Sequence, residues 1–541
     1  MNEIKRLVSG CLWAIAAAAQ SAAIAAPAEL RVGLVTIDAQ PIFAENEVRG
    51  PVRLFRLANR LHMRTRDRTI EAQLLFRTGE VFNPKLLEET ERNLRKLKFL
   101  REPKVTVVRT HDGLVDIAVV TSDVWSLSPT LSFGRSGGSN RTTFGVEETN
   151  FLGLGKQLAV GFQSDSVRDR RFIRYSDPNV AFGRWQLGAE FSKNSDGSLA
   201  RFDIARPFFA LDTPSALGLS LLHDDAEDRR DSLGIETDRY GRKQDVIDVY
   251  HGFSRGLQSD GVVRRFVFGA RFERAEFSPL IATTNSVGTV GALPEDRSYL
   301  YPYARFEWLA DGYSTERNLR QMSRTEDINY GLAYTLELGL APRALSAFDS
   351  PNALMVRATV SDAEAWQKGK HLLVWSAEFR GRVQNGGFEN ALVGGKADYF
   401  YRWNARSTSL LSVSTDFGRR LDLDQLLNLG GETGLRAYPD RYQNGTRRTL
   451  FSAEQRYYTS WQPLRLFNVG AAVFADVGKV SGDYSLQEAD AGWAREIGIG
   501  LRIVNNHTAF APVLHIDLAY PLDRVDGKRG LEFIVERRSS F

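Results

Sequence analysis

From Trp125 onward, this chain consists largely of short runs in which apolar and polar residues alternate, and the runs are separated by turns. Clear examples are residues 185–192, 373–380, 496–503 and 514–520. A period of two is that of a β-strand with one apolar and one polar face. The pattern therefore predicts a mostly β structure over the larger part of the chain.

Two kinds of β protein fit such a pattern. A soluble β-sandwich would turn its polar faces to bulk water and have shorter strands. A transmembrane barrel would turn its apolar faces to lipid, and the charged residues that recur on the polar faces here suit a water-filled interior. After the N-terminal segment no apolar run approaches the roughly 18 residues of a membrane helix, so a chain that spans a bilayer must close a barrel. We predict an antiparallel transmembrane β-barrel over residues 125–541.

The N-terminus has the features of a secretory signal peptide. Lys5 and Arg6 precede an apolar stretch, and small residues lead to a cleavage point before Pro27, which assigns residues 1–26 to the signal. The only cysteine, Cys11, superficially resembles a lipoprotein box, but most of the apolar stretch follows it. The exported chain then contains no cysteine and no disulfide.

Between signal and barrel the pattern changes. We expect an extended lead-in over residues 27–52 and a small α+β domain over residues 53–124. Asn83 can cap a helix that begins at Pro84, and Asp112-Gly113 predicts a hairpin turn between two strands. A shorter helix near residues 69–76, with an extended stretch before it, gives the order strand, helix, helix, strand, strand.

Several aromatic residues fall near predicted strand ends, where a barrel carries interfacial girdles; the alternative is that they are ordinary strand aromatics. They are Tyr299, Tyr301, Tyr303, Trp308, Tyr399, Tyr401 and Tyr457. The chain ends on Phe541, in phase with Leu531, Phe533 and Val535. A terminal aromatic in this phase resembles the C-terminal signal by which bacterial barrels are recognised for assembly.

Two motifs near the C-terminus are more specific. Leu429-Gly-Gly-Glu-Thr-Gly-Leu-Arg-Ala-Tyr lies in a long polar loop, residues 419–448, and Phe474-Ala-Asp-Val-Gly lies on the second strand after it. The first resembles the V-R-G-F/Y lid-loop motif of the BamA, TamA and two-partner-secretion transporter superfamily, and the second resembles its F/G-x-D-x-G strand motif. The module before the barrel resembles the POTRA domain of the same proteins.

The resemblance implies a barrel of about sixteen strands, with the lid loop folded into it so that Arg436 meets Asp476 on the inner wall. Gly434, Leu435, Ala437 and Tyr438 complete the lid-loop motif, and Phe474 and Gly478 complete the wall motif. Leu435 and Ala437 depart from the usual valine and glycine, and Ala437 puts in doubt a turn that needs positive φ there. Glu454 also faces inward; it is either a second partner of Arg436 or a lumen-lining carboxylate.

The resemblance further implies an outer-membrane factor that inserts or translocates other polypeptides, with the POTRA-like domain in the periplasm. Its partners would be client polypeptides, outer-membrane lipid and periplasmic chaperones. A dedicated two-partner-type secretion pore and a passive outer-membrane channel are the alternatives. We expect no enzyme, because Gly134-Arg-Ser-Gly-Gly satisfies G-x-S-x-G without the helix that a nucleophile elbow requires. The sequence indicates no cofactor, no metal and no nucleic-acid partner.

Overall fold

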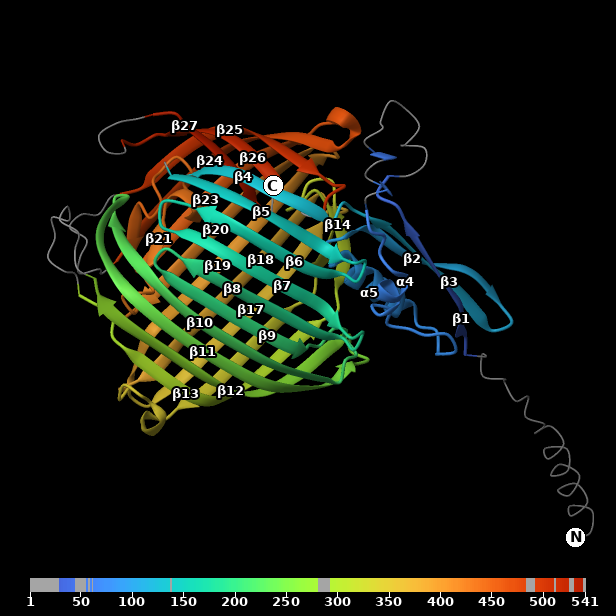
Figure 1. Ribbon diagram of the computed structural model, residues 1–541, viewed down its shortest axis with the longest axis horizontal. Helices are drawn as coiled ribbons and strands as arrows, with labels where there is room; N and C mark the ends of the chain where they lie inside the picture. The colour runs from blue at the N-terminus through green and yellow to red at the C-terminus, as the bar shows by residue number, and fades with distance from the viewer. Residues whose placement is uncertain are drawn as a thin grey trace, which may run out of the picture.

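The protein consists of a β-barrel and a small α+β domain placed at one end of it (Figure 1). This computed structural model describes residues 29–43, 55–56, 59–60, 62–136, 139–280, 292–482, 492–509, 512–524 and 530–538. The predicted signal peptide and Phe541 lie outside these residues. In the described part of the chain, no helix is both long enough and apolar enough to span a bilayer.

Twenty antiparallel strands close the barrel in sequence order, with β27 returning to β4. They are β4 (Leu127–Ser136), β5 (Ser139–Phe151), β6 (Lys156–Ser164), β7 (Asp169–Val180), β8 (Trp185–Asn194), β9 (Gly197–Arg206), β10 (Ser215–Ser232), β11 (Ile235–Leu257), β12 (Val262–Pro279), β13 (Arg297–Ala310), β16 (Ala333–Ala341), β17 (Ala353–Trp366), β18 (His371–Gln384), β19 (Gly387–Asn404), β20 (Ser407–Arg419), β23 (Arg447–Tyr458), β24 (Phe467–Ser481), β25 (Ala494–Asn505), β26 (Val513–Pro521) and β27 (Glu532–Arg538).

The predicted number of about sixteen strands is wrong, because the barrel has twenty. That number came from the resemblance to a superfamily and not from a count of turns. A membrane-crossing strand needs only about 9–11 residues, so the length of residues 125–541 is compatible with either number once loops of unknown length are included. Strand length here varies from seven residues in β27 to 23 in β11.

The predicted alternation places large apolar side chains on the outside of the barrel. Phe191, Phe268 and Ile499 are 53–55% exposed, which suits contact with lipid. Trp308 and Tyr457 belong to the same outer surface. The girdle interpretation is wrong for Tyr299, Tyr301 and Tyr303, however: they are buried and face inward, and their hydroxyl groups bond to Gln384, Glu273 and Asp248. Leu300, which lies between Tyr299 and Tyr301, is 36% exposed and occupies an outward-facing position of β13.

The N-terminal domain follows the predicted order of elements. It comprises β1 (Arg31–Gln40), α4 (Asp67–Glu71), α5 (Pro84–Arg95), β2 (Leu100–His111) and β3 (Leu114–Asp123). The Asn83 side chain caps α5 by accepting from the amide of Lys85, and Asp112 and Gly113 both have positive φ in the hairpin turn. The sheet order is β1-β3-β2 with β1 parallel to β3, so its first strand comes from the segment predicted as an extended lead-in.

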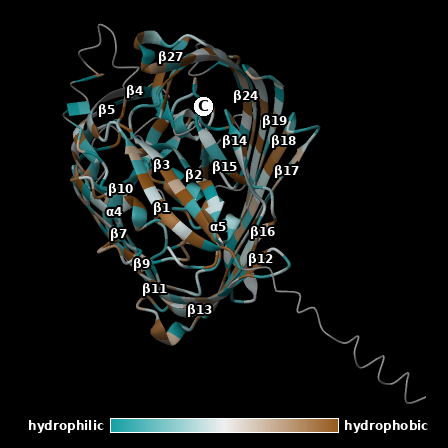
Figure 2. Cartoon of the chain, turned by 90° about the vertical axis from the view of Figure 1, so that its right-hand side faces the viewer, coloured by the Kyte–Doolittle hydropathy of each residue, from teal (hydrophilic) through white to brown (hydrophobic). Residues whose placement is uncertain are grey.

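Helix α5 and the turns around it fix this domain across one opening of the barrel, in front of the lumen in Figure 2. Glu89 accepts a 2.8 Å hydrogen bond from the backbone amide of Leu211, and the side-chain amide of Asn93 donates to the backbone carbonyl of Phe209. Burial raises the pKa of Glu89 above its usual range. We call this opening the domain end and the opposite opening the lid end.

Two long connections carry secondary structure of their own. At the domain end, residues 311–332 link β13 to β16 and form a hairpin of β14 (Tyr313–Arg317) and β15 (Thr325–Asn329). At the lid end, residues 420–446 link β20 to β23; they contain β21 (Leu427–Leu429), η2 (Gly431–Thr433) and β22 (Gln443–Gly445). Two further single 3₁₀ turns, η1 (Arg343–Leu345) and η3 (Pro463–Arg465), lie in other loops.

Candidate functional site: the lid loop and its buried ion pairs

The lid loop, residues 420–446, crosses the lumen at the lid end and is tied to the wall on several sides. Asp422 pairs with Arg382 of β18, and Asp424 pairs with Arg297 of β13, each at 2.7 Å. On the other side, Arg441 donates to the backbone carbonyl of Arg229 in β10. Contacts with β13, β18 and β10 mean that the loop spans the opening and does not lie along one wall.

Glycines allow the backbone of this loop to fold tightly. Gly430, Gly431 and Gly434 have φ values of 133°, 51° and 144°, a range that L-residues seldom adopt. A Cβ on Gly434 would also lie 2.8 Å from Leu450 and 2.9 Å from Leu429. The positive φ that the family pattern would require at position 437 is absent, so Ala437 is accommodated without strain.

Arg436 is the centre of the site and is only 6% exposed. Its Nη1 lies 2.5 Å from Oδ2 of Asp517 on β26, its Nη2 lies 3.5 Å from Oε2 of Glu454 on β23, and its Nε lies 4.0 Å from Oδ2 of Asp476 on β24. The guanidinium also stacks on the ring of Phe474 at 3.9 Å. One loop arginine thus contacts three strands of the barrel wall, β23, β24 and β26.

The structure brings the predicted pair Arg436 and Asp476 together, but at 4.0 Å the two side chains are too far apart for a hydrogen bond. The short hydrogen bond goes to Asp517 instead. Glu454, the alternative partner, lies between Arg436 and Arg456 and contacts both. Its position is therefore within the site and not elsewhere along the lumen.

A fourth carboxylate holds the backbone of the loop. Glu496 on β25 accepts hydrogen bonds from the amides of Arg436, at 2.9 Å, and Ala437, at 2.8 Å. Glu496 is 1% exposed and lies directly opposite Asp476 in the β24–β25 ladder. Arg436 and Ala437 are therefore held to the wall in two ways: the Arg436 side chain contacts β24 and β26, and the backbone amides of both residues contact β25.

The network continues along the wall through two further arginines. Arg456 pairs with Glu454 at 2.9 Å, and Arg502 pairs with Asp517. All seven side chains are buried: Arg436, Glu454, Arg456, Asp476, Glu496, Arg502 and Asp517. Burying an isolated ion costs several kcal/mol of lost hydration. Removing one member of the network would therefore leave its partners as buried charges without a counter-ion, which would strongly destabilise the docked loop.

Apolar contacts complete the docking of the loop. Leu429, Leu435 and Tyr438 are fully buried in a cluster with Phe474 and Ile534. The Tyr438 hydroxyl donates to the backbone carbonyl of Arg495 at 2.9 Å. Gly478 makes room for a loop side chain, since a Cβ there would lie 2.7 Å from Cδ2 of Leu429.

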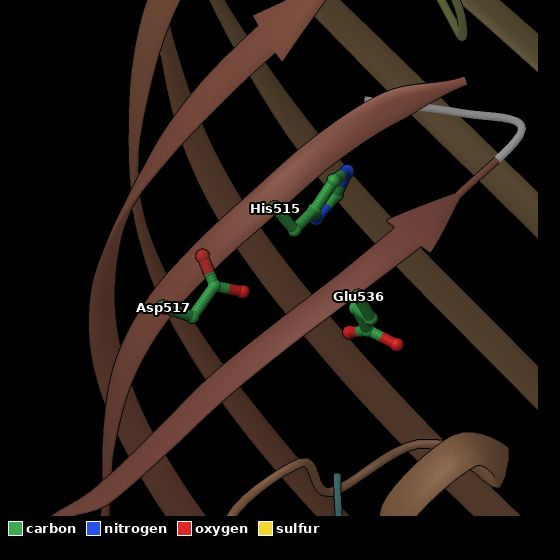
Figure 3. Close-up of side chains that lie close together, drawn as sticks. All are labelled: His515, Asp517 and Glu536. Atoms are coloured by element: carbon green, nitrogen blue, oxygen red, sulfur yellow. The ribbon is translucent and has the colours of Figure 1, made fainter. Parts of the chain in front are cut away.

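His515, Asp517 and Glu536 lie close together on β26 and β27, with one potential ligand atom from each within 4.8 Å of the others (Figure 3). A histidine and two carboxylates could in principle hold a divalent cation. Both carboxylate oxygens of Asp517 already accept from Arg436 and Arg502, however, and Glu536 pairs with Arg538 at 2.6 Å. These guanidinium groups make the cluster a continuation of the ion-pair network.

Sequence reasoning missed the roles of Glu496, Asp517 and Arg502. The period-two pattern does place all three on the inward face of their strands. Several inward carboxylates satisfy that condition, and the pattern does not say how far the loop reaches along the wall. The strand pattern therefore identified these residues as inward-facing, but it could not show which of them contact the lid loop.

Comparison with known proteins gave structural matches alone: no family model matches the sequence, and no curated protein matches it. The chain is similar in structure to CdiB and BamA. CdiB from Escherichia coli is 13% identical with a TM-score of 0.46, over 93% of this chain and 75% of that one. CdiB from Acinetobacter baumannii is 12% identical with a TM-score of 0.45, over 94% and 73%. BamA from Haemophilus ducreyi lacking POTRA domains 1–3 is 14% identical with a TM-score of 0.36, over 93% and 83%.

Proposed function

We propose that this protein inserts other polypeptides into the bacterial outer membrane or moves them across it. The observation that carries the proposal is the joint between the first and last barrel strands. In the described parts of β4 and β27, Val535 opposite Arg135 is the one paired position. On its other side β27 pairs with β26 along its whole described length. A wall that is continuous except at one joint can open there with little loss of backbone hydrogen bonding.

The N-terminal domain suits capture of an extended client. Strand β2 is an edge of its sheet, and Val107 and Val108 are 45% and 63% exposed on it. The other edge strand, β1, is partly covered, because residues 79–82 hydrogen-bond to Leu30 and Val32. A client strand would add to β2 through backbone hydrogen bonds, which give affinity with little sequence preference. The domain end would then face the periplasm.

The buried network would act as the lock of the lid loop. Arg436 joins the loop to β23, β24 and β26, close to the joint between β27 and β4, so a change in the lid would be felt by the strands that must part. A dedicated secretion pore is the second candidate, favoured by the wide lumen of a 20-stranded barrel. A passive channel fits less well, because the lid loop crosses the lumen.

Depletion of the protein in its native host, followed by quantitative proteomics of the outer membrane and the medium, tests this proposal. Loss of many barrel proteins from the membrane would support general insertion, and loss of one surface or secreted protein would identify a dedicated client. If neither fraction changed, the proposal would be wrong, and conductance of the purified barrel should then be examined for a channel.

A further inference from the structure

The connection between β13 and β16, residues 311–332, enters the barrel from the domain end. Its hairpin, β14 and β15, leads to a tip whose apolar residues Leu319 and Met322 are each 1% exposed. Most other turns at this end are short; for example, residues 405–406 suffice to join β19 to β20. We infer that residues 311–332 form a plug that closes the domain-end half of the lumen, as a closure distinct from the lid loop at the other end.

The first argument is where the tip is buried. Leu319 packs with Ala363 of β17, Leu372 of β18 and Phe400 of β19. Met322 packs in a separate cluster, with Tyr458, Ala472, Val504 and Val513 of β23 to β26. The tip is therefore packed against inward-facing side chains along the wall from β17 to β26.

Polar contacts fix the same segment to the lumen wall. Glu316 forms a 2.6 Å ion pair with Arg402 of β19 and accepts from the hydroxyl of Tyr330. The Tyr458 hydroxyl donates to the carbonyl of Asn318 at 2.8 Å, and Arg456 donates to the carbonyl of Leu319. Because Arg456 also pairs with Glu454, a partner of Arg436, the plug and the lid loop meet the same ion-pair network from opposite ends.

The tip also has a fixed internal shape. The carboxylate of Glu326 accepts hydrogen bonds from the amides of Leu319, Arg320 and Gln321 at 3.0–3.1 Å. The Asn318 side chain closes the turn by accepting from the amide of Ser323 at 2.7 Å. A loop whose backbone amides are satisfied internally can enter the lumen as a preformed unit.

The N-terminal domain holds the plug from outside. Arg95 of α5 forms a bidentate pair with Asp327, at 3.0 Å and 2.5 Å, and Arg92 stacks on Tyr313 at 3.8 Å. Glu102 accepts from both the amide and the hydroxyl of Thr325. The plug lies between the lumen wall and the domain, so movement of the domain would release it.

The size of the barrel makes such a plug useful. Barrels of 16–18 strands typically enclose an aqueous channel, and barrels of 22 strands are plugged. With 20 strands and the lid loop at one end, this barrel needs a second closure to prevent leakage when the lid moves. The inference concerns the barrel itself and does not depend on whether polypeptides are its clients.

Cysteine labelling tests whether the plug occupies the lumen. Ala472→Cys is placed beneath Met322, in a chain whose only natural cysteine lies in the predicted signal peptide. We expect a water-soluble maleimide to label it many times more slowly than Trp461→Cys, an exposed position on the adjacent turn, and to label it readily once residues 313–329 are replaced by a short Gly-Ser linker. Equal labelling of Ala472→Cys and Trp461→Cys in the intact plug would overturn the inference.

Ion conductance tests closure. The full-length protein with the lid loop shortened to a Gly-Ser linker is reconstituted in planar bilayers, with and without residues 313–329. Removing the plug should raise conductance several-fold, and Glu316→Gln should raise the frequency of openings. Asp349→Asn, in an exposed pair with Arg343 at the lid end, is the matched control and should change neither. If the lid-shortened barrel already conducts fully with its plug in place, the plug does not close the lumen.

Discussion

At the residue scale, the distances from the Arg436 guanidinium rank the surrounding carboxylates by how strongly each should hold it. Asp517 accepts from both Arg436 and Arg502, whereas Asp476 lies 4.0 Å from Arg436. We predict that Asp517→Asn weakens the docking of the lid loop by about 3–5 kcal/mol, the usual effect of breaking a buried pair, and that Asp476→Asn weakens it much less. A loss of 3 kcal/mol corresponds to about 100-fold in the rate at which trypsin cleaves after Arg441 of the opened loop.

Arg420→Ala is a suitable control for that experiment, because Arg420 forms an exposed pair with Glu389 that is expected to contribute at most about 1 kcal/mol. Cleavage of this control should proceed nearly as in the unchanged protein. The reverse ranking, with Asp476→Asn more sensitive than Asp517→Asn, would show that the pairing implied by the superfamily motif holds in the membrane and the contact seen here does not.

Gly478 gives a second prediction at this scale, because the absent side chain is what admits Leu429. We expect Gly478→Ala to destabilise the docked loop by about 1–3 kcal/mol through overpacking, measured by the same proteolysis. Leu429→Ala added to Gly478→Ala should recover part of this loss, although Leu429→Ala alone is harmful. Gly395→Ala, whose new Cβ would meet nothing closer than 3.9 Å, should be neutral. Additive effects of Gly478→Ala and Leu429→Ala would contradict the proposed contact.

At the scale of the strands, the joint between β4 and β27 can be locked covalently. Arg135→Cys with Val535→Cys places two cysteines at directly opposed positions. If clients leave through the opened wall, oxidation of this pair should abolish insertion, and a reductant should restore it. A client that passes along the lumen should be unaffected. Ala189→Cys with Phe202→Cys, opposed within the continuous β8–β9 ladder, is the control and should leave activity unchanged.

Strand-level features were also those that the sequence predicted best. Period-two alternation depends on neighbouring residues alone, so the outward phase of Phe191 and Ile499 and the inward phase of Asp476 could be read directly. The count of strands could not, because loop lengths are not fixed by any local pattern. Tyr299 to Tyr303 show the same limit: three tyrosines with an apolar residue between two of them match either phase, and only the charged partners Glu273 and Asp248 on neighbouring strands decide it.

The residues of the candidate site likewise fall into those that the sequence could identify and those that it could not. Arg436, Asp476 and Glu454 could be selected because a loop motif and strand phase mark them. Asp517 and Glu496 could not be assigned as partners, since their choice depends on how the loop crosses the lumen and on the stagger between β24, β25 and β26. The plug formed by residues 311–332 was also missed, because its packing partners lie on strands far away in the sequence.

At the scale of the whole molecule, the two ends of the barrel differ in structure. The N-terminal domain covers one opening, and β10 to β12 extend 18–23 residues toward the other, well beyond the length needed to cross a bilayer. If the domain end faces the periplasm, Ile235→Cys, 63% exposed at the lid end, should react on intact cells with a maleimide coupled to a large polymer. Val108→Cys on β2, also 63% exposed, should react only after the outer membrane is permeabilised. Phe268→Cys, on the lipid-facing surface, should remain protected in both conditions. Labelling of Val108→Cys on intact cells would reverse the orientation and would remove the periplasmic encounter with clients on which the proposed function depends.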